Sequence, residues 1–409
     1  MKNNKKTVKN NNKKLIIIIC ILLICIISLI IINKSIKEDE QVFLEPTQYN
    51  EKDFNLKLIK TVNSSVDKQN YLISPYSIEY SLNMLREATA NNSLKEIDEV
   101  APKREIPDLN LGKKIGVANG LFIKETYKDS VSKEFSNKLK EEYNSEILYD
   151  KFQTPKVIND WVDSKTNHLI PKLLDDIGKD FIFGIANALA IDVEWEIPFD
   201  PNNTKKENFT LENGKKIKTE MMHNIYKNRI KYFKDNHREG VIIPYKTEKD
   251  DKYALELILL MPNNSISEYI ENLKDTDLNI SEDSIDNSKN LQVELSLPKF
   301  EYDFDLKNFM TILKTMGIKD VFDSSKADLS KALSSTDAYV SKAVHKTKIK
   351  LNEKGTEAAA TTYYGTRKNA VYEEKQKIVK IDFNKPFIYI IRERNTKELL
   401  FFGSLYNPQ

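Results

Sequence analysis

The first third of the chain beyond residue 48 carries hydrophobic residues at helical spacing. Phe54, Leu58 and Val62 recur every four residues, which predicts a helix with this face buried. Ser74-Pro75 has the composition of a helix start, because serine caps the first turn and proline fits its first position. The same reasoning predicts further helices over residues 75–85, 131–139, 155–162 and 306–316.

Short apolar or alternating runs dominate the later part of the chain. They read ALELILLMP, LQVELSLPKF, HKTKIKLNE, QKIVKIDF, PFIYIIRER and LLFFGSLY. Alternating runs predict strands with one buried face, and continuously apolar runs predict strands covered on both faces. Helices early and strands late therefore predict the α+β class, with a large sheet covered by helices.

One run differs from all the others. Residues 15–32 read LIIIICILLICIISLIII, which contains no charge and would span about 27 Å as a helix, close to the thickness of a bilayer core. Because no small-residue cleavage site follows, the run favours an uncleaved signal anchor, with a cleaved signal peptide as the alternative. The preceding lysines predict a basic cytoplasmic arm over residues 1–14, and we expect a tether over 33–47 and one outer domain over 48–409.

The amino-acid composition excludes some structural and functional classes for this chain. With 409 residues, 40% of them hydrophobic and 10% aromatic, the chain is excluded from the disordered class. Eight lysines and no acidic residue fall within residues 1–37, which leaves 55 basic against 61 acidic residues for the rest, and we therefore expect no nucleic-acid partner. Both cysteines, Cys20 and Cys25, lie in the apolar run, so the outer domain is expected to lack disulfides and thiolate chemistry.

Catalytic and metal-binding motifs are absent from the sequence. The motifs G-x-S-x-G, H-E-x-x-H, G-x-x-x-x-G-K-[ST] and G-x-G-x-x-G do not occur. The four histidines stand apart from one another, at His168, His223, His237 and His345. We expect no metal and no cofactor, and an enzyme is the least favoured of the functional classes.

The segment between the strand runs KTKIKLNE and IVKIDF is unusual. It holds about 20 residues without a periodic pattern, which is long for a connection in a compact domain and typical of a functional loop. Its first half, GTEAAATT, has small side chains at alternate positions and would fit into a closed sheet as an added strand. Its second half contains Arg367 and Lys368 beside Asn369, the composition of an exposed protease target.

These motifs together resemble the serpin family. NEKGTEAAATT is similar to the family's hinge, and NKPFIYIIRERNTKELLFFGSLYNP resembles its C-terminal signature. Further similar blocks occur in family order: YLISPYSIEYSLNML, INDWVDSKTNHLIPKLL, IANALAIDVEWEIPFDPNNTKKENF followed by MM, VELSLPKF, LKTMGIKDVFDSSKADLS and VSKAVHKTKIKLNEKGTEAAA. The resemblance covers the chain from about residue 50 to its end.

The resemblance implies the serpin fold, with helices around three β-sheets and an exposed reactive-centre loop. It also implies a suicide mechanism, in which a protease cleaves the loop, the loop inserts into the main sheet (sheet A), and the acyl-enzyme is trapped. The implied hinge comprises Glu353, Gly355, Thr356, Glu357, Ala358, Ala359, Ala360, Thr361 and Thr362. The implied scissile region comprises Arg367, Lys368, Asn369 and Ala370, with the bond after Lys368 or after Asn369 preferred.

Two further groups of residues carry family roles. A sheet-opening cluster is implied for Ser74, Ser77, Asn187 and His345. A loop-entry region is implied for Trp195, Lys299 and Glu353, where the lysine and the glutamate are expected to form a surface ion pair. The chain departs from the family pattern in AIDVEW, which lacks a Lys-Gly pair before the tryptophan, and in the long interval from Glu353 to Pro386.

The resemblance also implies the partners. We expect a monomer held at the cell membrane by its N-terminal helix, with the serpin domain outside, or secreted if that helix is cleaved. The expected target is an extracellular serine protease, with cysteine proteases as an additional class. The alternative function is that of a non-inhibitory serpin that binds a ligand or a partner, although the small side chains of the hinge favour an inhibitor.

Overall fold

The computed structural model describes residues 43–107, 109, 114–335, 337–356 and 377–409, and these form the basis of every structural statement below. From Leu44 to Gln409 they belong to one compact unit. The predicted basic arm and signal anchor lie outside the described residues, as do residues 33–42 of the tether, so these assignments stay predictions. Within the described part, no helix is long and apolar enough to cross a membrane.

Side-chain caps mark the start of two of the predicted helices. Asp53 accepts a hydrogen bond from the backbone N–H of Leu56, and Ser74 accepts one from Ser77. The helices are α2 (Phe54–Ser65), α3 (Pro75–Ala88), α4 (Asn91–Val100), α5 (Lys133–Tyr143), α6 (Lys156–Lys165), α7 (Ile266–Glu271), α8 (Asp275–Leu278) and α9 (Phe309–Met316). Short 3-10 turns span Glu125–Ser130, Pro201–Asn203, Glu282–Ser284 and Asp320–Phe322.

The strands of the described residues form three sheets. The main sheet has the order β3 (Ile147–Asp150), β2 (Ile115–Lys124), β4 (Phe183–Ile191), β13 (Val340–Leu351), β14 (Gly355–Thr356), β5 (Val193–Glu194), and β12 (Phe300–Asp305) also pairs with β13. A six-stranded sheet has the order β1 (Tyr71–Ile73), β17 (Leu399–Leu405), β16 (Phe387–Glu393), β10 (Leu255–Pro262), β9 (Arg238–Pro244), β8 (Lys231–Lys234). A four-stranded sheet has the order β15 (Lys377–Asp382), β11 (Leu291–Pro298), β7 (Lys216–Lys227), β6 (Lys205–Thr210). The predicted α+β class with three sheets is confirmed.

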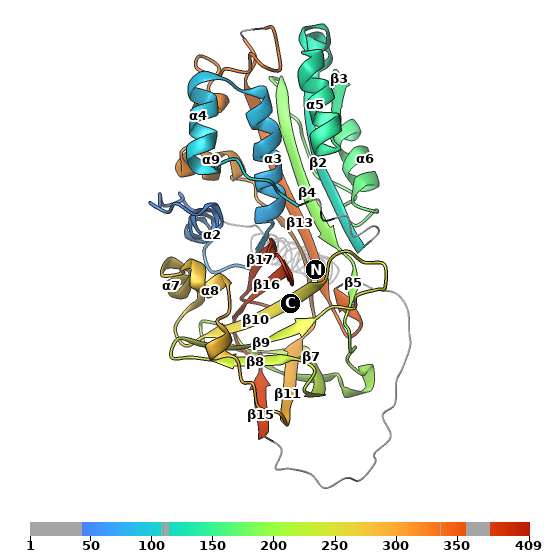
Figure 1. Ribbon diagram of the computed structural model, residues 1–409, viewed down its shortest axis with the longest axis vertical. Helices are drawn as coiled ribbons and strands as arrows, with labels where there is room; N and C mark the ends of the chain where they lie inside the picture. Colours follow the sequence, from blue (N-terminus) through green and yellow to red (C-terminus); the bar gives the residue numbers. More distant parts are fainter. Residues whose placement is uncertain (1–42, 108, 110–113, 336, 357–376) are drawn as a thin grey trace, which may run out of the picture. The chain divides into compact units, whose positions relative to one another are not determined.

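The pairing of β4 with β13 is the feature that matters for function. The two strands run side by side and are parallel (Figure 1), from Phe183 opposite Val340 to Ala190 opposite Lys348. By contrast, β4 is antiparallel to β2, and β13 is antiparallel to β12. We call this parallel β4–β13 contact the seam. No strand lies between its two members over the described positions.

Helix α6 and the segment that follows it cover one face of the seam. Alanines of β4, together with Val344 of β13, join a hydrophobic cluster that includes Ile158 and Val162 of α6. The helix lies so close that a Cβ atom on Gly120 of β2 would stand 2.5 Å from the Trp161 ring. Residues 166–182, which we call the strap, lead from α6 to β4, and Lys346 of β13 donates a hydrogen bond to the strap carbonyl of Lys172 at 2.8 Å.

Candidate functional site

The main sheet opens at one end of the seam, and the first hinge residues fill the opening. Beyond Ala190 and Lys348 the strands diverge, and β14 lies between β13 and β5. Thr356 pairs with Leu351 on one side and with Val193 on the other, and both pairings are antiparallel. Two residues of the predicted hinge therefore already occupy the position of an additional central strand.

Both residues of β14 fit this position closely. A Cβ atom on Gly355 would lie 2.0 Å from the carbonyl oxygen of Val193, so the close approach of the two backbones requires glycine here. The Thr356 side chain is completely buried and shares a 2.8 Å hydrogen bond with the hydroxyl of Tyr245. Burial raises the pKa of Tyr245, so its hydroxyl stays neutral and available for this bond.

Trp195 holds the entry of the opening in place. Its ring stacks on Tyr245 at a centroid distance of 4.8 Å and an interplanar angle of 5°. Its indole N–H donates to the carbonyl of Asn352, and its backbone N–H donates to the carbonyl of Lys354, both at 2.9 Å. The predicted loop-entry tryptophan thus contacts the backbone on which the hinge begins.

The predicted Lys299–Glu353 pair is present, with Nζ and Oε1 3.2 Å apart. It is not a surface pair, however, because the Glu353 side chain is only 12% exposed and also accepts a 2.8 Å hydrogen bond from Thr204. Burial works to raise the pKa of Glu353, but the hydrogen bonds from Thr204 and Lys299 outweigh it and hold that pKa below its usual range. The carboxylate therefore stays charged beneath the entry point.

The predicted sheet-opening cluster also comes together, and it spans the seam. Asn187 of β4 lies opposite His345 of β13, and the Asn187 Oδ1 atom is hydrogen-bonded to the His345 Nδ1 atom. The backbone N–H of Ser74, at the start of α3, donates to His345 Nε2 at 3.1 Å. The Asn187 amide donates to the Ser77 hydroxyl at 2.6 Å.

The protonation state of His345 follows from these contacts. Its Nε2 atom accepts a hydrogen bond from Ser74, so its Nδ1 atom carries the proton that is donated to Asn187. The ring is completely buried, and this burial lowers the pKa of His345 to about 3. A neutral histidine therefore bonds directly across the strands that an incoming strand would have to separate.

Sequence reasoning missed three members of these two groups. Asn119 of β2 accepts hydrogen bonds from Ser77 and Asn187, both at 2.8 Å, and Ser81 of α3 accepts one from Asn187 at 3.0 Å. Tyr245 was missed at the loop entry. The available signal for Asn119 was one amide inside the apolar strand run GVANGLF, since a buried polar side chain requires partners.

The rest of the predicted site lies outside the described residues. This holds for the hinge positions from Glu357 to Thr362 and for the scissile region Arg367 to Ala370. Within the described chain, no group of three or more His, Cys, Asp or Glu residues is arranged to hold a metal ion.

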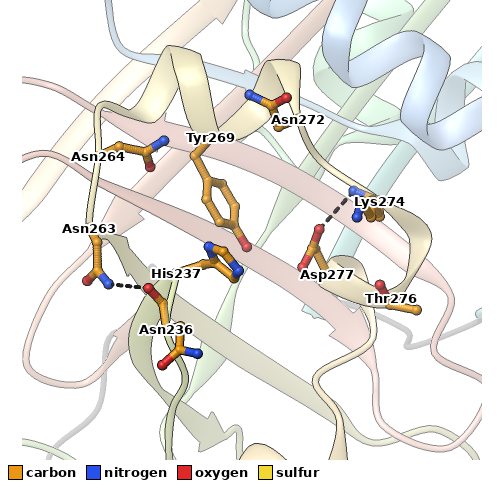
Figure 2. A pocket seen from close by; sticks show the side chains of 9 residues that line it. All are labelled: Asn236, His237, Asn263, Asn264, Tyr269, Asn272, Lys274, Thr276 and Asp277. Carbon is orange, nitrogen blue, oxygen red and sulfur yellow. Dashed lines mark hydrogen bonds between the residues drawn. The ribbon is translucent and has the colours of Figure 1, made fainter.

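A cavity of about 610 Å³ lies away from the hinge, beside the β8–β9 turn and helices α7 and α8 (Figure 2). The residues that line it are Asn236, His237, Asn263, Asn264, Tyr269, Asn272, Lys274, Thr276 and Asp277. The Asn263 amide donates to the carbonyl of Asn236, and the backbone N–H of Lys274 donates to Asp277. None of the residues that line it belongs to the predicted hinge, loop-entry region or sheet-opening cluster, so the hinge and the seam form the candidate site.

Comparison with known proteins agrees with this geometry. The family model described as Serpin (serine protease inhibitor) matches residues 49–408. A serine protease inhibitor of Mus musculus is 30% identical over 384 residues, which cover 87% of this chain and 82% of that protein. The native-state structure of tengpin, a thermophilic serpin, is 29% identical with a TM-score of 0.73, covering 88% of this chain and 93% of that one.

Human thyroxine-binding globulin, solved with thyroxine, shares the fold. It is 24% identical with a TM-score of 0.74, and the match covers 88% of this chain and 97% of that chain. The family match over most of the chain and the relative at 30% identity lead to one assignment. The chain belongs to the serpin family.

Proposed function

We propose that the protein is an inhibitor that traps a protease by inserting its cleaved reactive-centre loop into the seam. The observation that carries the proposal is the position of β14, where two hinge residues pair with strands on both sides. The remaining hinge residues would continue this strand once cleavage frees the loop from β15.

The two registers of β14 make the proposal specific. Continued antiparallel pairing from Leu351 and Val193 would bring the same loop residue, Thr362, opposite His345 and opposite Asn187. The hydroxyl of Thr362 would then stand between the two side chains that bond across the seam. It could donate to one of them and accept from the other, so the buried cluster would regain its partners after the seam opens.

Insertion of the loop would lower the free energy of the main sheet, because it would change how β4 and β13 are paired. The parallel pairing of β4 with β13 would be lost, and two antiparallel pairings would replace it. Antiparallel pairs are slightly more stable per residue, and the new strand would form backbone hydrogen bonds on both of its sides. The small side chains Ala358 and Ala360 would face inward without displacing the core.

The chemical step belongs to the protease. Its serine hydroxyl attacks the carbonyl carbon of the scissile bond, an ester forms, and the amine of the next residue leaves with a proton. We assign the bond to the region Arg367–Ala370, after Lys368 or after Asn369. Water would normally hydrolyse the ester, but insertion would carry the bound protease across the main sheet and distort its active site first.

The proposal also covers the target protease of the inhibitor and its location at the cell membrane. We assign an extracellular serine protease as the target, with cysteine proteases as a second class, and a monomer as the acting species. The apolar run 15–32 would anchor the inhibitor at the outer face of the cell membrane. Sequencing the N-terminus of the mature protein tests the anchor, since a start beyond residue 33 would mean a cleaved signal and a secreted inhibitor.

The decisive experiment is a trapping assay. Residues 46–409 are incubated with trypsin-like, chymotrypsin-like, subtilisin-like and papain-like proteases, and denaturing gels are inspected for a covalent complex. We expect a complex with at least one serine protease, and mass spectrometry of the released peptide locates the scissile bond. If every protease cleaves the loop and is released, the inhibitor proposal fails, and the alternative of a binding serpin replaces it.

A hinge variant tests the mechanism within the same assay. Thr356→Arg would force a charged side chain into a completely buried position, which slows insertion and lets hydrolysis finish first. We expect the variant to be cleaved as a substrate, with the number of inhibitor molecules used per trapped protease at least about tenfold higher. The matched control is Lys354→Arg, two positions earlier on a partly exposed residue, which should trap like the parent protein.

A further inference from the structure

We propose that the cavity beside the β8–β9 turn is a binding site for a short uncharged saccharide. The inference goes beyond the proposed function, because the residues that line the cavity belong neither to the hinge nor to the seam. At about 610 Å³ the cavity falls within the range of roughly 300–1,000 Å³ that is usual for ligand pockets. Its walls come from the β8–β9 turn, the connection from β10 to α7, and the two helices α7 and α8.

Amide side chains are the most frequent groups around this cavity. Four of the nine lining residues are asparagines, namely Asn236, Asn263, Asn264 and Asn272. Figure 2 shows their side chains set around the ring of Tyr269, which adds apolar surface among them. An amide presents an N–H donor and a C=O acceptor side by side, so it can bond to two neighbouring hydroxyl groups at once. Neighbouring hydroxyl groups on a carbon ring are the defining feature of a saccharide.

The fold leaves most of these amide groups available. Neither the Asn236 nor the Asn264 side chain bonds to another described residue. The Asn263 amide donates to the carbonyl of Asn236, and the Asn272 amide donates to the carbonyl of Glu268. Both of these amides therefore keep their oxygen atoms as acceptors for a ligand.

Backbone conformation does not explain the asparagines. Asparagine is frequent in turns partly because it tolerates a left-handed backbone. None of the four cavity asparagines has a positive φ. Elsewhere in the described chain, four other asparagines do have one: Asn91, Asn144, Asn167 and Asn228. The amides at the cavity are therefore free to serve a ligand rather than a turn.

Hydrogen bonds hold the walls of the cavity in place. The backbone N–H of Asn263 donates to the carbonyl of His237 and its amide donates to the carbonyl of Asn236, both at 2.8 Å. One residue thus ties the connection after β10 to the β8–β9 turn. The Asp235 carboxylate also accepts from the backbone N–H groups of His237 and Arg238, at 2.8 and 3.1 Å. A ligand would meet a preorganised site, so little conformational entropy would be lost on binding.

A buried arginine fixes the tyrosine at the centre of the cavity. Arg238 is 4% exposed, and its guanidinium donates to the Tyr269 hydroxyl at 2.8 Å and to the carbonyl of Asp277 at 2.7 Å. Burial raises the pKa of Tyr269, so the hydroxyl stays neutral. Because this hydroxyl accepts a hydrogen bond from Arg238, its own proton is left to be donated to a ligand.

The charges around the cavity favour an uncharged ligand. Two cations, Arg238 and Lys274, are matched by two carboxylates, Asp235 and Asp277. A sulfated or phosphorylated ligand would therefore find no excess of positive charge. The described chain also places no group of three or more His, Cys, Asp or Glu residues where a metal ion could be held. Hydrogen bonds to hydroxyl groups are what this lining can offer.

Saccharide binding is tested without any protease. The full chain, kept in solution with a detergent that carries no sugar, is applied to an array of uncharged gluco-, manno-, galacto- and N-acetylhexosamine oligosaccharides beside sulfated and uronate-containing counterparts. The free oligosaccharide that binds most strongly is then titrated by calorimetry. We expect uncharged glycans to bind, and Asn236→Ala/Asn264→Ala to weaken that binding at least about tenfold, because two amides are lost. The matched control Asn287→Ala/Asn384→Ala removes two exposed amides elsewhere and should bind like the parent.

The other outcomes overturn the proposal. They are the absence of binding to every uncharged glycan, unchanged affinity in Asn236→Ala/Asn264→Ala, and a preference for sulfated or uronate-containing glycans that disappears at high salt. A lowered melting temperature in that variant would assign the two amides to the stability of the fold instead. Protease trapping by the variant should match the parent, so the saccharide site and the proposed function can each fail alone.

Discussion

His345 is one side chain whose protonation makes the stability of the fold depend on pH. Its pKa is lowered to about 3 in the folded protein, whereas an unfolded histidine has a pKa of about 6.5. Between these values the unfolded chain binds a proton that the folded protein does not bind. The stability from the neutral histidine is therefore complete above about pH 6.5 and is lost as the pH falls towards 3.

We expect the free energy of unfolding to fall by up to about 1.4 kcal/mol per pH unit from this residue. Urea unfolding at about pH 7 and about pH 5 measures the slope. His345→Gln should flatten it, and His237→Gln, at an exposed histidine, should leave it as in the parent. Equal slopes for the parent and His345→Gln would show that burial of this ring does not control the pH response.

A substitution at Thr362 should change the stability of the cleaved protein but not that of the intact protein. Thr362→Val keeps the shape of the side chain and removes its hydroxyl. After insertion His345 and Asn187 would therefore lack the hydroxyl group between them as a hydrogen-bond partner. We expect the cleaved form to lose about 1–3 kcal/mol, or about 2–6 °C in melting temperature, while the intact form melts like the parent. Thr361→Val, on the outer side of the same strand, is the control. A cleaved Thr362→Val protein that melts like cleaved parent would contradict the extended register.

Helix α6 and the strap limit access to the seam. Asn159 of α6 accepts hydrogen bonds from the backbone N–H groups of Leu173 and Leu174 and donates one to the carbonyl of Leu174, so one side chain ties the helix to the strap. Asn159→Ala should loosen the strap and lower the barrier to opening of the seam. A synthetic peptide of residues 356–367 should then insert roughly tenfold faster.

Thermal melting after increasing incubation times measures that insertion, because we expect a filled sheet to melt at a higher temperature. Asp160→Ala is the matched control, since its exposed carboxylate pairs within α6, with Lys156. If the peptide enters the parent and Asn159→Ala at the same rate, the strap does not limit strand entry.

Elements with strong periodic patterns could be predicted from the sequence, and long-range partners could not. The alternating run HKTKIKLNE includes the second half of β13, up to Leu351, and the run PFIYIIRER contains β16, as expected. Asn187 and His345 meet across 158 residues of chain, and Tyr245 reaches Thr356 across 111, so local spacing carries no signal for either contact. Here the family resemblance supplied the cluster but not Asn119 or Tyr245.

The burial of individual side chains could not be predicted from residue patterns either. The Lys299–Glu353 pair was expected at the surface, yet the glutamate is largely buried because Thr204, Lys299 and the neighbouring backbone enclose it. The helix predicted from residue 306 begins at Phe309, since Leu306 bonds instead to the carbonyl of His345 on β13. In both cases a tertiary contact outweighs the local pattern.

Cleavage of one peptide bond in the loop should raise the thermal stability of the entire molecule. A strand of about ten residues entering the main sheet would add backbone hydrogen bonds worth about 0.5–1.5 kcal/mol each. We therefore expect the protein nicked between residues 367 and 370 to melt at least about 10 °C above the intact protein. Calorimetry of both forms checks this. Equal melting temperatures would mean that the freed loop stays out of the sheet.

If the seam opens for one strand, as proposed, this would determine how the protein can be used in the cell. A sheet that has accepted its own loop cannot accept it again, so each molecule would act once and then be inactive. Protection against a protease would then depend on the number of fresh copies at hand rather than on how tightly one copy binds. Synthesis of the chain, and not dissociation of a complex, would be the step that restores the defence.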